Sequence, residues 1–151
     1  MRRIYIVLPV LFGICLMFVA SGNTYSSADL TKLLTTKQCP NCDLTSAPLS
    51  NSPLSNANFQ NAKLSGADMN GTNLTSAILW NASASGATMI RATLYNADLS
   101  GTDLTNANLT NANLYGAKIT PLTKLAGANL SGATWIDGRQ CTQGSIGECK
   151  K

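Results

Sequence analysis

The chain has 151 residues, with 11 lysines and arginines against seven aspartates and glutamates, and it has no histidine. Without histidine it lacks the commonest general base and the commonest metal ligand of proteins. The formal charge of +4 falls to +2 once residues 1–22 are set aside, because nine basic and seven acidic residues remain. A balance this close to neutral argues against a nucleic-acid-binding surface, which needs a clustered basic patch.

The first segment of the chain is a predicted secretory signal. A basic start precedes an apolar run at Ile4–Ala20, and small residues follow it. This order predicts a signal peptide over residues 1–22, cut near Asn23. The alternative is a retained membrane anchor, although a run of 17 residues that contains Pro9 is short for a bilayer. After cleavage we expect no membrane association.

The next segment, residues 23–38, is predicted to form an N-terminal capping helix. Ser26 with Asp29 three residues later is typical of a helix start. Leu30, Leu33 and Leu34 are expected to share one face of a helix over residues 27–37. This apolar face would cover the start of the repeats that follow, because the open end of a repeat stack needs a cap.

A period of five residues dominates residues 39–137. An apolar residue, the centre, returns at every fifth position from Leu44 to Ile119 and again, after one extra residue, from Leu125 to Trp135. The centre is leucine in 13 of 19 repeats, and the residue two positions earlier is alanine in 14 of 19. A fixed alternation of one large and one small side chain predicts a narrow interior filled by those two positions.

The second residue after each centre predicts a corner. It is glycine or asparagine in 14 of 19 repeats, and these residues accept a positive φ most readily. A corner every five residues, of type II, closes a four-sided coil of about twenty residues, and such coils stack at the ~4.8 Å spacing of strands. Nineteen repeats make about 4.75 coils of an all-β solenoid. Pro121 cannot adopt a positive φ, and the register slips by one residue beside it.

The repeats resemble a known family. Runs such as residues 97–99 and 107–109 follow the pattern A-[DN]-L-x-x and are similar to the pentapeptide repeat family over about residues 39–137. The resemblance implies that family's fold, a right-handed quadrilateral β-helix. The segments around Cys39 and after Trp135 also resemble exported members, known mainly from cyanobacteria, most of which have no assigned activity. We therefore expect a non-enzymatic structural or protein-binding chain that is periplasmic, lumenal in the thylakoid, or secreted.

Four cysteines remain after the predicted signal, at Cys39, Cys42, Cys141 and Cys149. The two pairs lie at opposite ends of the repeats, ~20 Å apart by the coil count, whereas a disulfide needs α-carbons within ~7 Å. This leaves only the pairings Cys39–Cys42 and Cys141–Cys149, which an exported, oxidising location favours. For Cys39 and Cys42 the alternative is two buried thiols in the first coil. The second bond would staple a C-terminal cap over residues 138–151.

Apolar side chains interrupt the polar faces at a few positions. Tyr95 and Tyr115 are one coil apart and should stack on one face, and Ile136 falls next on that face after the slip. Ile78 and Trp80 flank a centre and should both point outward. Exposed apolar columns mark partner sites, so the five residues form a candidate contact face for an unknown protein or for self-association. The alternative is that they only cover the rod.

Two other classes of function are alternatives, a redox protein and a DNA mimic. A small thiol–disulfide redox protein would use Cys39 and Cys42, which have C-x-x-C spacing, but the motif follows a predicted helix and does not start one. A gyrase-protecting DNA mimic, known in the family, needs rows of acids that this chain does not supply. We expect no cofactor, no catalytic residues and no metal site, because the distance between the cysteine pairs forbids a zinc site of four ligands.

Overall fold

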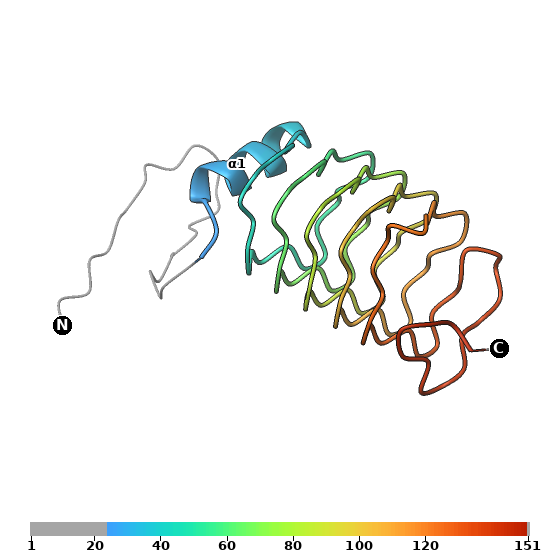
Figure 1. Cartoon of the computed structure of the whole chain (residues 1–151). Helices are drawn as coiled ribbons and strands as arrows, with labels where there is room; N and C mark the ends of the chain where they lie inside the picture. Colours follow the sequence, from blue (N-terminus) through green and yellow to red (C-terminus); the bar gives the residue numbers. More distant parts are fainter. Residues whose placement is uncertain (1–23, 151) are drawn as a thin grey trace.

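The computed structural model describes residues 24–150, so the predicted signal over residues 1–22 lies outside the described residues. The described chain forms one helix, α1 (Ser27–Thr36), followed by a long series of short parallel β-bridges. The backbone winds in successive coils along one axis, with α1 at the first coils and the C-terminus at the other end (Figure 1). No helix within residues 24–150 is both long and apolar enough to cross a membrane.

Helix α1 is capped at both ends. The Ser26 side chain accepts a hydrogen bond from the N–H of Asp29 at 3.2 Å, as expected for a helix start. At the other end Lys37 adopts a left-handed φ of 57° and donates its N–H to the carbonyl of Leu33. A left-handed residue ends an α-helix, so α1 stops at Thr36, one residue before the predicted end.

One face of α1 packs on the first coil. Leu30 and Leu33 are buried there, whereas Leu34 is 52% exposed. The prediction that all three leucines share the buried face is therefore wrong for Leu34. The end of a coil of twenty residues is narrow, so it covers only the stripe through Leu30 and Leu33 and leaves the adjacent side chain in water.

The coil period is twenty residues. Parallel bridges join one residue of each repeat to the residue twenty positions later, from Gln38 with Asn58 to Asp98 with Lys118. A centre donates its N–H to the next coil, as Leu79 does to the carbonyl of Asp98 at 2.8 Å. The preceding position donates back, as Asp98 does to the carbonyl of Ala77 at 2.9 Å. Because these bonds repeat on every face, four pentapeptides close one turn of a stacked ladder.

Each corner is a tight turn that needs a positive φ. In the first full repeat the carbonyl of Leu44 accepts from the N–H of Ala47 at 3.0 Å, and Ser46 between them has a φ of 58°. The same position is left-handed in every repeat from Asn41 to Gly132 except at Pro121. Asparagine and glycine predominate there because other residues are strained in that region.

Where aspartate or asparagine precedes the centre, as in nine of the nineteen repeats, it closes the corner from outside. Its side-chain oxygen accepts the N–H of the residue two positions later, as Asp103 does from Thr105 at 3.0 Å and Asn113 does from Tyr115 at 3.0 Å. This N–H lies outside the inter-coil ladder, so the side chain supplies its partner. The motif A-[DN]-L-x-x thus has a physical reason at its second position as well as at its alanine and leucine.

The interior contains the centres and the small residues two positions before them. All centres from Leu44 to Leu114 are at most 1% exposed. Thr72 and Thr102 replace alanine at the small position and are fully buried. Their hydroxyls donate at 2.7 Å to the carbonyls of Leu49 and Leu79 in the preceding coil. A buried hydroxyl is tolerated when it is hydrogen-bonded, so these departures from alanine leave no polar group unsatisfied.

The register slip occurs where the sequence predicts it. The bridges span twenty residues up to Asp98 with Lys118, and twenty-one from Asp103 with Lys124 onward. The extra residue is accommodated in a turn in which the N–H of Thr123 donates to the carbonyl of Thr120 at 2.9 Å. Pro121 lies inside this turn, because its ring excludes the positive φ of the usual corner.

The C-terminal segment folds back on the last coil. Its residues pair antiparallel with two faces of that coil, through the bridges Asn129 with Ile146 and Thr134 with Gln140. In Figure 1 this segment closes the red end of the stack. The antiparallel direction differs from every inter-coil bridge, so residues beyond Asp137 form a return segment and not a further coil.

Candidate binding surfaces

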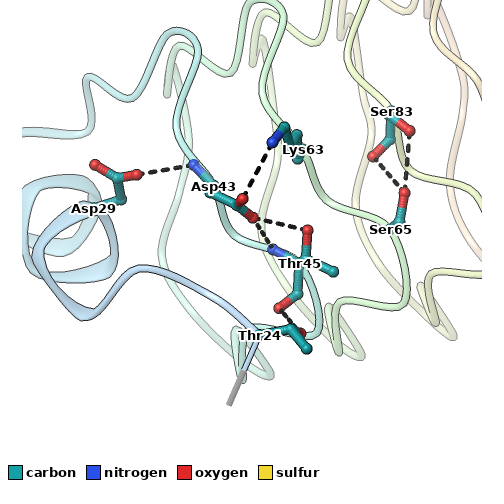
Figure 2. Close-up of polar contacts among 7 residues, drawn as sticks. All are labelled: Thr24, Asp29, Asp43, Thr45, Lys63, Ser65 and Ser83. Carbon is teal, nitrogen blue, oxygen red and sulfur yellow. Dashed lines mark hydrogen bonds and ion pairs between the residues drawn. The ribbon is translucent and has the colours of Figure 1, made fainter. Parts of the chain in front are cut away.

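Asp43, the first aspartate of the ladder, forms hydrogen bonds that stabilise the fold (Figure 2). Asp43 accepts hydrogen bonds from the Thr45 hydroxyl at 2.8 Å and from Lys63 Nζ at 3.3 Å, while its own N–H donates to the Asp29 carboxylate at 2.8 Å. The hydroxyl and the N–H of Thr45, with a smaller effect from Lys63, lower the pKa of Asp43. A carboxylate with these partners locks a corner, and it is not poised to take up a proton near neutral pH.

Two further aspartates repeat this arrangement near the other end. Asp98 pairs with Lys118 at 3.3 Å and Asp103 with Lys124 at 3.1 Å, each lysine lying one coil above. Burial raises the pKa of Asp98, but donors including Lys118 outweigh burial and lower it. Three aspartates of the ladder are therefore paired with lysine, and no three acidic or cysteine side chains within residues 24–150 gather as a metal site would require.

The four described cysteines form two bonds. The Sγ atoms of Cys39 and Cys42 are joined with an α-carbon separation of 5.3 Å, and those of Cys141 and Cys149 with a separation of 4.9 Å. Cys39 and Cys42 are at most 3% exposed. The first bond lies in the core just after α1, and the second closes the return segment on itself.

Two tyrosines form an exposed pair on one corner column. Tyr95 and Tyr115 are 39% and 47% exposed, and their ring centroids lie 5.8 Å apart with the planes tilted by 34°. Their stacking follows from the ladder, since the N–H of Asn96 donates to the carbonyl of Tyr115 at 3.0 Å. This is an ordinary distance for an aromatic contact.

Ile136 continues the same column but in a different environment. The N–H of Gly116 donates to its carbonyl at 3.1 Å, which places Ile136 directly above Tyr115 in register. Its side chain is half-buried against the core, while a Cβ on Gly138 would lie 3.2 Å from the Tyr115 ring. The start of the return segment therefore covers this end of the column, and Ile136 is part of the packing as much as of the surface.

Ile78 and Trp80 lie on the next face of the solenoid. Both are exposed, at 42% and 43%. Ile78 bridges to Asp98 in the coil above, and the N–H of Asn81, beside Trp80, donates to the carbonyl of Ser100. Each therefore stacks against polar residues. Four of the five predicted contact residues are exposed, and among these four the structure stacks only Tyr95 on Tyr115.

The sequence did not predict an apolar region at the final coil. Ile119 and Leu125 are centres by their spacing, yet both are only half-buried, and Leu122 between them is 75% exposed. Their position in the final coil is the signal that identifies them, because a last centre is covered only if a cap reaches it. The antiparallel return segment covers two faces of that coil, and these residues belong to the other two.

Comparison with family models gives a match to pentapeptide repeats. Eight copies are matched over residues 52–89 and 87–120. No curated protein sequence matches the chain. The matched region lies inside the stacked coils, where the A-[DN]-L-x-x pattern is most regular.

Two solved structures are similar to this chain over most of its coils. One is a pentapeptide repeat protein from the thylakoid lumen of Arabidopsis thaliana, 34% identical, with a TM-score of 0.63 over 70% of each chain. The other is a pentapeptide repeat protein from Nostoc PCC 7120, 29% identical, with a TM-score of 0.60 over 64% of this chain and 82% of that one. The repeat geometry and these similarities together show that the chain belongs to the pentapeptide repeat family, whose fold is the right-handed quadrilateral β-helix.

Proposed function

We propose that this chain is an exported, non-enzymatic rod of close to five coils that binds a partner protein or a second copy of itself through its side. The observation that supports this is the exposed pair Tyr95 and Tyr115, stacked at 5.8 Å. Tyrosine offers a large apolar ring with a polar tip and is enriched at protein interfaces. Covering the pair would remove apolar area from water, which favours association.

Export is the second part of the proposal. It is supported by the signal pattern at residues 1–22, by the two disulfides, which persist in oxidising compartments, and by the thylakoid-lumen origin of the similar Arabidopsis protein. The mature chain would work in a periplasm or a thylakoid lumen, or be secreted. It would then be free of the membrane, with α1 and the return segment capping the coils.

The two alternatives are less well supported. A redox role for Cys39 and Cys42 needs a sulfur that an external thiol can reach, whereas both residues are at most 3% exposed. A DNA mimic needs rows of unpaired acids, whereas Asp43, Asp98 and Asp103 each pair with a lysine. A binding rod requires neither accessible thiols nor a negative surface.

A pair of surface variants tests the proposal. The baits are residues 23–151 of the parent, of Tyr95→Arg with Tyr115→Arg, and of Gln60→Arg as a control with the same substitution at an equivalent corner position. Each captures partners from the exported fraction, and sedimentation velocity reports self-association. We expect an association that the parent and the control keep and the tyrosine variant loses. Ile136 stays unchanged, because arginine at a half-buried position would disturb packing.

The tyrosine variant must remain folded for the comparison to count, which its unfolding temperature shows. If it keeps every association of the parent, the column has no binding role and the two rings serve only to cover the coils. If the parent itself associates with nothing, including itself, the proposed binding function is wrong.

A further inference from the structure

The two ends of the coil stack treat their sheet edges differently. At the first coil the carbonyl of Asp43 accepts from the N–H of Ser26, and its N–H donates to the Asp29 carboxylate. On the next two faces the edge position is Pro48 and Pro53, which have no N–H to offer. An uncovered edge is a template for another strand, so this end is protected by α1 and by proline.

At the last coil the described residues form backbone hydrogen bonds across only two of the four faces. The N–H of Leu130 donates to the carbonyl of Ser145 at 2.8 Å, and that of Gly132 to the carbonyl of Cys141 at 3.0 Å. On the adjacent face Cys141 donates to the carbonyl of Ala133 at 2.8 Å. The return segment therefore supplies the hydrogen bonds of a further coil on these faces.

The remaining two faces end in the open edge, defined here as the strands centred on Ile119 and Leu125. One coil below, the N–H groups of Leu99 and Leu104 donate to the next coil at 2.9 and 2.8 Å. Those of Ile119 and Leu125 have no acceptor within residues 24–150. Both side chains are half-buried, and Leu122 beside them is 75% exposed. The open edge thus combines two backbone donors that have no acceptor within residues 24–150 with apolar side chains, of which Leu122 is exposed.

A lysine precedes the centre on each strand of the open edge. Lys118 and Lys124 are 65% and 66% exposed at the side chain. Each lysine pairs with one aspartate in the coil below. An ammonium group has three N–H donors, so each lysine can also donate to a second carboxylate. A second copy meeting this edge would place lysine against lysine, and edge lysines oppose that kind of self-pairing. The charge favours an acidic occupant.

We propose that the open edge binds an acidic peptide segment of another protein, which bends at the corner between Ile119 and Leu125 and adds one short strand to each of the two faces. The carbonyls of that segment would accept from the N–H groups of Ile119 and Leu125. Its own N–H groups would donate to the carbonyls of Ala117 and Thr123, which accept no backbone hydrogen bond within residues 24–150. Its apolar side chains would cover Ile119 and Leu122. Its carboxylates would lie beside Lys118 and Lys124. Strand addition takes its affinity from main-chain bonds and its specificity from alternate side chains. This deepens the proposed binding role by naming a partner chemistry at a surface separate from the tyrosine pair.

Fluorescence anisotropy with a defined probe tests the inference. The probe is a labelled peptide with a glutamate–valine stretch on each side of an asparagine–glycine corner. It is compared with the same peptide carrying lysine in place of glutamate, and with its N-methylated form. We expect saturable binding of the first peptide alone. Lys118→Gln with Lys124→Gln should weaken it about tenfold or more, which corresponds to about 1.4 kcal/mol.

The control variant is Lys63→Gln. Lys63 is 66% exposed and pairs with Asp43 at the same 3.3 Å as Lys118 with Asp98, but it lies away from the open edge. It should bind the peptide as the parent does, and so should Tyr95→Arg with Tyr115→Arg. Absence of binding, equal binding of the N-methylated peptide, or no effect of the lysine variant would overturn the inference. A dimer of the parent that the peptide does not dissociate would also overturn the inference.

These results separate the two proposals. Loss of peptide binding together with capture through the tyrosine pair removes only the open-edge inference. Peptide binding without any role for the tyrosine pair removes only the side surface as the binding site.

Discussion

Substituting one corner glycine offers a direct measure of how neighbouring coils fit together. Gly86 and Gly101 have nearly the same left-handed φ, 65° and 68°. A Cβ built on Gly86 meets nothing within 4 Å, whereas one built on Gly101 would lie 2.2 Å from Oδ1 of Asn81 in the coil below. The two glycines therefore share the backbone requirement and differ only in the space above the preceding corner.

The magnitudes follow from these two terms. A left-handed residue with a Cβ costs about 1–2 kcal/mol, and the smaller entropy of the unfolded alanine chain returns about 0.4–1 kcal/mol. Gly86→Ala should thus lower the free energy of unfolding by about 1 kcal/mol. Gly101→Ala must also displace the Asn81 amide, and an off-rotamer side chain adds about 0.5–1.5 kcal/mol. We expect Gly101→Ala to cost about 2 kcal/mol.

Equilibrium unfolding in urea, followed by circular dichroism, gives the free energies. A double-mutant cycle with Asn81→Gly isolates the contact, since glycine keeps the left-handed φ of 54° at that corner and removes the amide. The coupling should be about 1 kcal/mol, with the double variant relieved of the clash. Equal costs for Gly86→Ala and Gly101→Ala, or a cycle that is additive, would refute the argument that the Asn81 amide disfavours a Cβ at position 101.

Three further predictions follow. The folded-state pKa of Asp103 lies below its ordinary 3.8, so the stability that this carboxylate adds to the fold is complete above pH 3.8 and is lost as the pH falls through the folded-state pKa. Asp103→Asn should therefore shrink the drop in unfolding temperature between neutral pH and about one pH unit below 3.8. An unchanged drop would contradict this. Replacing Cys141 and Cys149 by serine removes a crosslink with a sequence separation of 8. It should lower the free energy of unfolding by about 2.5 kcal/mol, or the unfolding temperature by about 5–10 °C. An unchanged unfolding temperature would mean that the other bonds of the return segment hold it in place. Pro48→Ala with Pro53→Ala restores two N–H groups at the first edge and should produce concentration-dependent association in sedimentation velocity, whereas a variant that stays monomeric would deny the prolines a protective role.

Much of the fold could be predicted because every repeat reports the same three constraints. The large residue at the centre and the small one before it fill the interior, and the positive φ sets the corner, so each pentapeptide carries the same pattern that predicts the coil. The register slip at Pro121 was predictable for the same reason, since proline excludes a corner conformation that its neighbours require. The cap at Ser26 is likewise local, since its side chain bonds three residues away.

The candidate surfaces were predicted less completely. The stacking of Tyr95 on Tyr115 follows from the period, and both rings are exposed. The half-burial of Ile136 depends on where the chain turns after Asp137, which no repeat dictates. Leu34 differs from its prediction because the width of the coil end, and not the helix periodicity, decides which leucines are covered.

The sequence by itself determined the coil, its corners and the order of its columns, because contacts between residues twenty apart are set by a strict local period. Only the tertiary structure decided how the stack ends. The return segment pairs antiparallel with two faces of the last coil and leaves Ile119 and Leu125 on the other two. That outcome depends on contacts outside the repeat, between segments with no shared pattern, so no period in the sequence could specify it.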